Sequence, residues 1–322
     1  MAKTSHKSVS FHPEKDIPSL AGRVILITGA SDGLGKQAVF EYARHNPAHI
    51  WLAVRNLSKA ETVVADVRRR LSSSFTGAIS VVHCDLSSLE SVREAALTVL
   101  GASERLDILM LNAGVMAVDP GLTDDGYETH FGTNFLGHAL LLALLIPLLQ
   151  TTTLLPDADP RVVMVSSDLH TMAPADEGIR FDSLRRPATD DATPYLLYGQ
   201  SELAIILLAR RMARVYPRFK TVAVHPGAVH TELLTKGTGG AKTVGSTLSR
   251  MFRHGSGGTS TQSVEQGVRN QLWASVADGV RSGEYYVPVG VLDAGSEWTQ
   301  DDFLAMELWH WTHGELEPFM QT

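Results

Sequence analysis

The sequence contains one cysteine, no excess of basic residues and no apolar run that we expect to span a membrane. Among its 322 residues, the single Cys84 excludes an internal disulfide and fits a reducing compartment, where such a residue is usually a buried small hydrophobe. The net charge of −7 and the pI near 6.0 provide no basic field of the kind that binds nucleic acid. We therefore expect no nucleic-acid partner.

The N-terminus and the most apolar segment indicate a cytoplasmic protein. Residues 1–20 mix charges and prolines and have no apolar core, so we expect an extended arm rather than a signal peptide. The run ALLLALLIPLLQ at 139–150 has about half of the ~20 apolar residues that a spanning helix needs, and Pro147 interrupts it. This run predicts a buried helix and no transmembrane segment, with peripheral membrane contact left open.

Short apolar runs alternate with longer segments of helical character along the chain. This alternation is typical of a parallel sheet with crossover helices on both faces. We therefore predict one doubly wound α/β domain over 1–322, a Rossmann fold with a seven-stranded parallel sheet and a helical extension at 291–322. The predicted strands are 24–28, 49–54, 79–84, 106–112, 161–167, 221–226 and 285–290.

One segment of low complexity, 237–262, has two Gly-rich clusters around a short apolar periodicity. Glycine hinges flanking a small amphipathic helix indicate a substrate lid, which we place at 232–262. A surface insertion without such a role is the alternative.

The first predicted strand runs directly into TGASDGLG at 28–35. Gly29, Gly33 and Gly35 fit a tight turn whose backbone approaches a pyrophosphate at a helix N-terminus, with Ser31 and Leu34 in the same turn. Because the turn lies between a predicted strand and a helical segment, the pattern favours dinucleotide binding over an ordinary glycine turn.

The end of the second predicted strand indicates which dinucleotide is preferred. An NAD-binding fold usually has an acid there for the adenosine ribose, whereas this chain has Val54 and Arg55. A guanidinium pairs well with phosphate, so Arg55 favours NADP. A solvated loop arginine is the alternative reading.

Taken together, these motifs resemble those of the short-chain dehydrogenase/reductase family over nearly the whole chain. The tail at 263–290, followed by a helix with two tryptophans, is most similar to the retinol dehydrogenase-like branch, which implies NADP and lipophilic alcohols or carbonyls. The resemblance implies further cofactor contacts at the ends of the strands. These are Asp85 and Leu86, Asn112, Ala113 and Gly114 of LNAG, and Pro226, Gly227, Val229 and Thr231 of HPGAVHTEL.

The same resemblance implies the catalytic residues. Asn134 matches an asparagine that holds a proton-relay water, and Ser167 matches a serine that hydrogen-bonds the substrate oxygen. Tyr198 matches the general acid or base, which also contacts the cofactor. The family has lysine four residues after this tyrosine, and this chain has Glu202.

Glu202 therefore leaves three hypotheses open. A carboxylate near Tyr198 raises the tyrosine pKa, where an ammonium would lower it, by ~1–3 units. We expect an NADP-dependent oxidoreductase that reduces a carbonyl of a lipophilic small molecule rather than oxidising an alcohol. The alternatives are a non-redox isomerase, dehydratase, cyclase or lyase that uses Tyr198 and Glu202, or a catalytically inactive binding protein. No histidine spacing predicts a metal site, and a homo-oligomer is left open.

Overall fold

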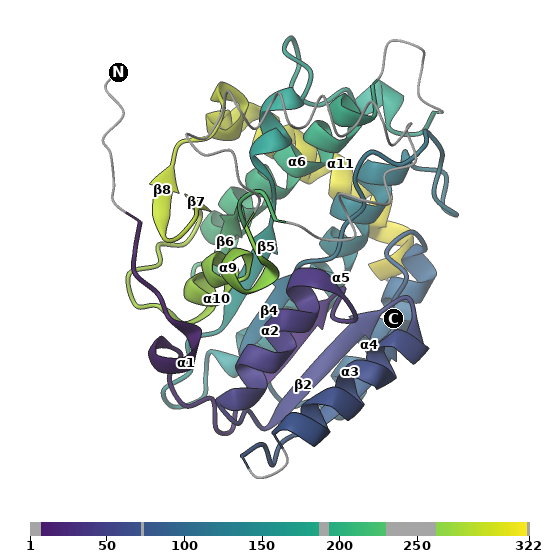
Figure 1. The fold of residues 1–322 in the computed structure, drawn as a ribbon. Coiled ribbons are helices and arrows are strands. Elements are labelled where there is room, and N and C mark those ends of the chain that lie inside the picture. The colour runs from purple at the N-terminus through teal and green to yellow at the C-terminus, as the bar shows by residue number, and fades with distance from the viewer. Residues whose placement is uncertain (1–7, 72–73, 187–192, 230–261, 321–322) are drawn as a thin grey trace.

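A single eight-stranded sheet runs through the computed structural model, which describes residues 8–71, 74–186, 193–229 and 262–320. The strands are β1 (Val24–Thr28), β2 (His49–Val54), β3 (Ala78–His83), β4 (Ile108–Leu111), β5 (Arg161–Val165), β6 (Lys220–Val224), β7 (Tyr285–Val287) and β8 (Val291–Asp293). Their order is β3-β2-β1-β4-β5-β6-β7-β8 (Figure 1). Neighbours are parallel except β7 and β8, which are antiparallel.

Helices cover both faces of the sheet, and alternate strand residues face the two layers. Leu26 of β1 belongs to one apolar core, whereas Ile25 and Ile27 belong to the other. The first core contains α4 (Leu89–Ala102), α5 (Gly137–Thr152), α6 (Pro194–Val215) and α11 (Asp302–Met320), and the second contains α2 (Gly33–Arg44), α3 (Leu57–Arg70) and α10 (Arg269–Val276). The short helices are α1 (Pro13–Asp16), η1 (Phe131–Leu136), η2 (Asp168–Met172), η3 (Phe181–Ser183), α9 (Val264–Gly267) and η4 (Glu297–Gln300).

The strand order reverses at β1, which pairs with β2 on one side and β4 on the other. In open α/β sheets, ligands bind in the crevice outside the carboxyl ends of the strands at this switch point. The fold therefore directs the search for a site to the segments that follow β1, β4, β5 and β6.

The predicted doubly wound α/β fold is confirmed, with one strand more than expected. Each of the seven predicted runs contains a strand, and β8 is the addition. Val291–Asp293 is three residues long and not buried, so no apolar run marks it. The predicted lid at 232–262 lies outside the described residues except for Gln262, and the division of the chain as a single domain stays a prediction.

Residues 8–20 belong to the predicted extended arm, but they are not extended throughout. They include the short helix α1, and three apolar side chains in this segment, Phe11, Ile17 and Leu20, are buried in the core that contains α2 and α3. The backbone of Val9 donates a hydrogen bond to the Val289 carbonyl at 2.8 Å. Apolar contacts thus fix this segment to the domain.

The segment Phe131–Thr152, which covers η1 and α5, is apolar enough to cross a membrane by length and composition. In the fold, 78% of its most apolar window is buried inside the protein. It lies between α4 and α6 in the first core, as expected for a buried helix at 139–150. Its apolar character is therefore explained by packing.

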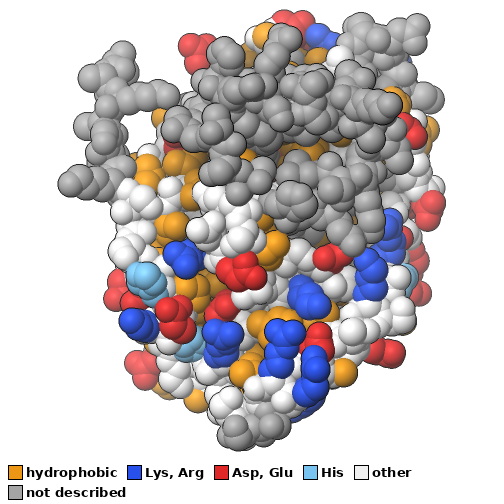
Figure 2. Space-filling model, viewed as in Figure 1, with side chains coloured by type: hydrophobic (Ala, Val, Ile, Leu, Met, Phe, Trp, Pro, Cys, Tyr) orange, Lys and Arg blue, Asp and Glu red, His pale blue; other side chains and the backbone are white. Residues whose placement is uncertain are grey.

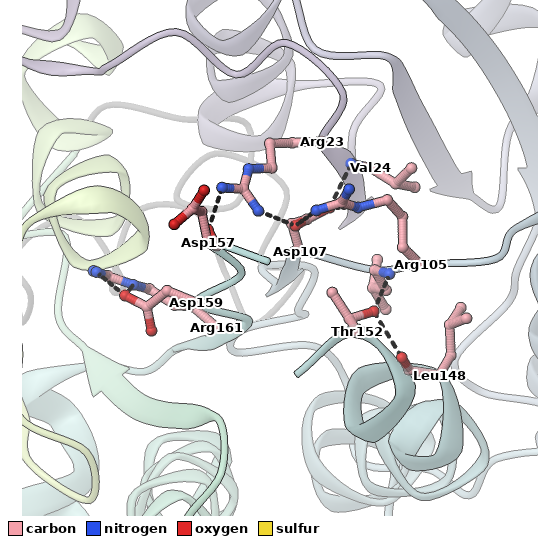
Figure 3. A network of polar contacts seen from close by, with 10 residues as sticks. Arg23, Val24, Arg105, Asp107, Leu148, Thr152, Asp157, Asp159 and Arg161 are labelled. Atoms are coloured by element: carbon pink, nitrogen blue, oxygen red, sulfur yellow. Dashed lines mark hydrogen bonds and ion pairs between the residues drawn. The ribbon is translucent and has the colours of Figure 1, made fainter. Parts of the chain in front are cut away.

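A polar network holds the strands together at the edge opposite the switch-point crevice (Figure 3). Asp107, which is 4% exposed, precedes β4 and accepts hydrogen bonds from Arg23 at 3.0 Å and Arg105 at 2.8 Å. It also accepts from the Val24 backbone at 2.9 Å. One buried carboxylate thus joins the starts of β1 and β4.

We expect Asp107→Asn to lower the free energy of unfolding by about 3 kcal/mol, because it removes the charge that two guanidinium groups share. Urea denaturation measures this loss. The control is Glu90→Gln, which breaks an exposed ion pair with Arg93 and should change stability by less than about 1 kcal/mol. Equal effects of the two substitutions would contradict the assigned role of Asp107.

Candidate functional site

The glycine turn after β1 has the geometry of an anion cradle. Gly29 and Gly33 have φ values of +66° and +51°, which L side chains rarely adopt. A Cβ on Gly35 would lie 2.4 Å from the Gly29 carbonyl oxygen, so only glycine fits there. Asp32 caps α2 by accepting from the Gly33 backbone at 2.7 Å. The chain therefore turns tightly and places the N-terminus of α2 at the switch point.

The ends of β1 and β4 are joined through Thr28. Its hydroxyl oxygen accepts from the backbone of Asn112 at 2.8 Å and of Ala113 at 3.1 Å. The Asn112 amide donates to the Thr28 carbonyl at 3.1 Å and accepts from Gln271 at 3.0 Å. The predicted LNAG contacts are thus held beside the glycine turn, with Gly114 exposed at the rim.

His138 completes this junction, although the sequence analysis did not identify it. Since the Thr28 hydroxyl already accepts two N–H groups, it must donate to His138 Nε2, 2.9 Å away. His138 Nδ1–H then donates to the Asn134 carbonyl at 2.8 Å. Burial lowers the pKa of His138 to about 4, so the ring is neutral. The sequence signal that could have identified His138 is its position four residues, or one helical turn, after Asn134.

The Pro-Gly turn after β6 approaches the glycine turn from the other side. Gly227 has a φ of +88°, and a Cβ on Gly267 would meet both Val229 and Leu34 within 3.2 Å. Val229 and Leu34, which were predicted from two motifs far apart in the sequence, therefore both lie against Gly267. Pro226 lies in the same turn, and Thr231 lies outside the described residues.

Other predicted cofactor residues lie around this crevice with differing degrees of exposure. Asp85 follows β3 and accepts from the backbone of Ser87 at 3.0 Å, and Leu86 is buried. Ser31 is partly buried within the glycine turn. Arg55 is exposed immediately after β2. The predicted set is thus spread along the carboxyl edge of the sheet, from β3 to β6.

Asn134 lies in η1, where its amide is fully engaged. Its Oδ1 accepts from the Val115 backbone at 2.8 Å, and its Nδ2 donates to the Val115 carbonyl and the Ser201 hydroxyl, each at 3.0 Å. Ser201 in turn donates to the Tyr198 carbonyl at 2.7 Å. Asn134 thereby connects the segment after β4 to the helix that carries Tyr198.

Ser167 and Tyr198 meet at the carboxyl end of β5. Ser167 begins η2 by accepting from the Leu169 backbone at 3.1 Å. It lies close enough to Tyr198 of α6 to lower the pKa of that phenol. Tyr198 is 6% exposed. Burial and the nearby Glu202 raise the pKa of Tyr198, so its hydroxyl is neutral at ordinary pH. The pair can donate hydrogen bonds and a proton to a substrate oxygen.

Glu202 lies one turn after Tyr198 on α6 and is 4% exposed. The Ser166 hydroxyl donates a hydrogen bond to the Glu202 backbone carbonyl at 3.0 Å. Burial raises the pKa of the Glu202 carboxyl group to about 8 and outweighs the lowering effects of Ser166 and Tyr198. Glu202 is therefore mostly protonated at neutral pH. The repulsion that we expected between a Glu202 carboxylate and an ionised Tyr198 is therefore small at neutral pH. The sequence alone did not reveal how far burial suppresses the ionisation of Glu202.

Four polar residues near Tyr198 were not predicted as site residues. Asp168 Oδ1 lies 3.6 Å from His225 Nε2, and the Asp168 backbone donates to His225 Nδ1 at 3.4 Å. His170 packs edge-on against the Tyr285 ring, with centroids 5.3 Å apart. These four residues come from η2, from the end of β6 and from β7, so no local sequence pattern could have identified them as a group.

An apolar cluster adjoins the other side of Tyr198. Met116, Ala117 and Leu169 are buried against the tyrosine, and Met172 and Tyr195 pack on the outside. Ligand pockets are usually lined by such side chains around a few convergent polar groups. This cluster can contact an apolar substrate next to the Tyr198 hydroxyl.

The residues at the switch point fit a dinucleotide. The space that a Cβ on Gly35 would fill, the positive φ values of Gly29 and Gly33, and the start of α2 together leave backbone N–H groups accessible to a pyrophosphate. Tyr198 and Ser167 lie at the ends of α6 and β5 on the same edge of the sheet. This arrangement can serve hydride transfer or acid–base chemistry.

Comparison with known proteins agrees with the motifs. A family model described as short chain dehydrogenase matches residues 23–177. The chain is 37% identical to human retinol dehydrogenase 13 over 67% of its own length, a match that spans only 61% of that protein. It is 33% identical to the short-chain dehydrogenase/reductase drtF of Aspergillus calidoustus, covering 93% of this chain and 95% of drtF.

A solved structure extends the likeness to the whole fold. An uncharacterized protein from Mycobacterium paratuberculosis superposes with a TM-score of 0.69 at 29% identity, covering 94% of this chain and 97% of that one. The chain therefore belongs to the short-chain dehydrogenase/reductase family of oxidoreductases, in its retinol dehydrogenase-like branch.

Proposed function

We propose that the protein is an NADP-dependent oxidoreductase that reduces the carbonyl group of a lipophilic small molecule. The observation that carries this proposal is the neutral hydroxyl of the buried Tyr198, which lies near Ser167 beside the dinucleotide crevice. A neutral phenol is ready to donate a proton, as carbonyl reduction requires. Alcohol oxidation would first require ionisation of a group whose pKa is raised.

In the proposed mechanism, the cofactor supplies hydride when bound, and this chain supplies positioning and the proton. Ser167 Oγ donates a hydrogen bond to the substrate oxygen and stabilises the charge that develops there. Tyr198 Oη transfers its proton to the same oxygen. Gly29, Gly33 and Gly35 would hold the pyrophosphate, and Asn134 fixes the helix backbone at Tyr198 through Ser201.

Glu202 acts as a neutral neighbour of Tyr198 in this proposal. As a protonated acid it adds little charge beside the phenol at neutral pH, so it does not prevent proton donation. It also cannot lower the tyrosine pKa as an ammonium would. We therefore expect a reductase with a slower proton-transfer step than one that carries lysine at this position.

The apolar wall of Met116, Leu169 and Met172 supports a lipophilic substrate. The proposal is tested by adding long-chain aldehydes and aromatic ketones to the protein with NADPH and following the loss of cofactor absorbance. Loss that depends on both substrate and protein supports the proposal. Absence of NADPH consumption together with substrate turnover would identify a non-redox enzyme.

The adenosine end of the crevice supports NADP over NAD. Arg55 follows β2 where an NAD enzyme has an acid, and α3 begins two residues later with Lys59 in its first turn. Figure 2 shows several Lys and Arg side chains over the part of the face where α2 and α3 lie, interspersed with acids. A 2′-phosphate would meet positive charge there.

We expect Arg55→Ala to weaken NADPH binding by about 2 kcal/mol, roughly 30-fold in Kd, and to leave NADH binding nearly unchanged. Isothermal titration calorimetry with each cofactor measures both values. Arg281→Ala removes an exposed arginine near β7 and serves as the control. Equal affinity of the unmutated protein for NADPH and NADH would contradict the assignment to NADP.

A non-redox reaction is the second candidate because Glu202 lies one turn after Tyr198 on α6 and has a pKa of about 8. A group that titrates near neutrality suits a general acid or base in an isomerisation, dehydration, cyclisation or cleavage. A binding protein without catalytic activity is the third candidate. The cytoplasmic location and a homo-oligomeric state stay predictions.

A further inference from the structure

A groove with mostly apolar walls lies where α11 packs against α5 and α6 (Figure 1). Two of the α5 residues that line it, Ala139 and Ala143, are four positions apart and share one face of the helix. Their small side chains leave space that leucine, the commonest residue of α5, would fill. Larger apolar side chains line the rest of the groove, among them Leu142, Ile146, Leu208, Met212, Leu316 and Met320.

The groove is separate from the crevice that contains Tyr198. Leu208 and Met212 follow Tyr198 on α6 by ten and fourteen residues, which places the groove roughly 15–21 Å farther along the helix. Its free space is about 430 Å³ when the open mouth is included. A ligand would therefore lie along the groove, with one side in contact with solvent.

One end of the groove contains a buried hydroxyl without a partner. Thr312 lines the groove one turn after Trp309 and is 4% exposed. Its Oγ1 has no hydrogen-bond partner among the described residues. The adjacent His313 commits its Nδ1 to the Trp309 carbonyl, 2.9 Å away. Because a buried hydroxyl without a partner is destabilising, an oxygen atom of a ligand that accepts from Thr312 would bind favourably there.

Arg211 brings a positive charge to the same end of the groove. Its guanidinium carbon lies 5.6 Å from the ring centre of Trp309, which lines the groove. The Arg211 Nε is buried and has no hydrogen-bond partner among the described residues. Arg210 and Arg214, its neighbours on α6, already share Asp302, at 3.1 and 2.9 Å. Arg211 acts electrostatically on that same carboxylate, so three guanidinium groups surround one acid and the region favours a further anion.

We propose that the groove binds a free fatty acid of medium chain length, with the carboxylate near Arg211 and Thr312. The aliphatic chain would lie between α5 and α11, toward Leu316 and Met320, where it leaves water. A guanidinium group matches the geometry of a carboxylate, and the threonine hydroxyl can donate to the same group. A neutral lipid would leave Arg211 without an anion, and a short carboxylate such as acetate would leave the apolar walls in water.

The charge of the ligand is tested by calorimetric titration of the full chain, without cofactor, with decanoate and with neutral 1-decanol. We expect decanoate to bind about tenfold more tightly than decanol. Arg211→Gln should weaken decanoate binding about tenfold and leave decanol binding unchanged, because it removes only the charge. Arg218→Gln loses the same charge at an exposed position beyond α6 and is the control. Unchanged decanoate binding in Arg211→Gln would overturn the proposal.

The place of the chain is tested by filling the groove. Ala143→Leu should weaken the binding of both decanoate and decanol at least tenfold, whereas Ala102→Leu, at the exposed end of α4, should not. Thr312→Val should weaken decanoate binding about fivefold, as expected for the loss of one hydrogen bond. Circular dichroism verifies the fold, and Ala143→Val replaces Ala143→Leu if the larger side chain prevents folding. Full decanoate binding in the filled variant would contradict a site in the groove.

Photolabelling distinguishes the groove from other sites. A decanoate analogue that carries a diazirine should label peptides of α5 and α11, and labelling confined to the residues around Tyr198 would overturn the proposal. Binding to phosphatidylserine vesicles without binding of free decanoate would also overturn it, as would a dimer that Ala143→Leu dissociates in analytical ultracentrifugation. None of these measurements uses NADPH consumption, so failure of this site is distinguished from failure of the proposed function.

Discussion

Tyr198→Phe is expected to reduce NADPH-dependent turnover by a factor of about 10²–10⁴, because it removes the proton donor at the substrate oxygen. NADPH binding should be little changed, since the glycine turn and the N-terminus of α2 are untouched. Initial rates with a lipophilic aldehyde and calorimetric titration with NADPH measure the two quantities. The loss should appear mainly in kcat, as for an interaction made in the transition state.

The matched control for this change is Tyr216→Phe. Tyr216 follows α6 and stacks on Phe219, with ring centroids 5.8 Å apart, far along the helix from the site. The Tyr216→Phe variant also loses one phenol hydroxyl, and we expect it to retain full turnover. Turnover that survives in Tyr198→Phe would remove Tyr198 from the mechanism.

Substitutions at Glu202 are expected to produce the second large effect, and its size depends on pH. As pH rises through about 8, Glu202 ionises beside Tyr198 and raises the pKa of the phenol further, so turnover by the unmutated protein falls. Glu202→Gln keeps the neutral form and should match the unmutated rate at pH 7 but exceed it at pH 9. Glu202→Lys should lower the Tyr198 pKa and raise turnover by about tenfold or more.

The redox reading would be contradicted if both Glu202 substitutions abolished the native reaction while NADPH still bound. Neither amide nor ammonium can accept a proton at neutral pH, so that result would identify Glu202 as a working base. Glu41→Gln is the control, because Glu41 is 7% exposed in α2, outside the site. Its pH–rate profile should follow that of the unmutated protein.

The same carboxyl group should make stability depend on pH. Between the ordinary Glu pKa and about 8, folded Glu202 holds a proton that the unfolded chain has released, so the free energy of unfolding falls as pH rises. Glu202→Gln should remove this fall and gain on the order of 3–5 kcal/mol relative to the unmutated protein at pH 9 but not at pH 5. Urea denaturation at both values measures the difference.

Local patterns were sufficient for the fold and for the cofactor turn. The apolar runs that became β1, β2, β4, β5 and β6 are largely buried strands, whereas β3 at the end of the sheet is mostly half-buried. Gly29, Gly33 and Gly35 lie within one short segment between a predicted strand and a predicted helix, so local sequence predicts the cradle. β8 has no such pattern, because the strand is only three residues long and is partly exposed.

The electrostatics of the site could not be read from the sequence. The raised pKa of Glu202 depends on burial and on Ser166 and Asp168 from the segment after β5. The Thr28–His138 bond joins residues 110 positions apart, and Asp168 meets His225 across two strands. Such contacts follow from tertiary packing, which residue type and spacing do not specify.

The most direct test of the proposed reaction uses NADPH that carries deuterium at the transferable position of the nicotinamide ring. The protein, this cofactor and a lipophilic aldehyde are incubated, and the product is examined by mass spectrometry and NMR. The account predicts an alcohol with one deuterium on the carbon that carried the carbonyl, formed in equal amount to oxidised cofactor and lost in Tyr198→Phe. A product without deuterium, formed while NADPH stays reduced, would contradict it.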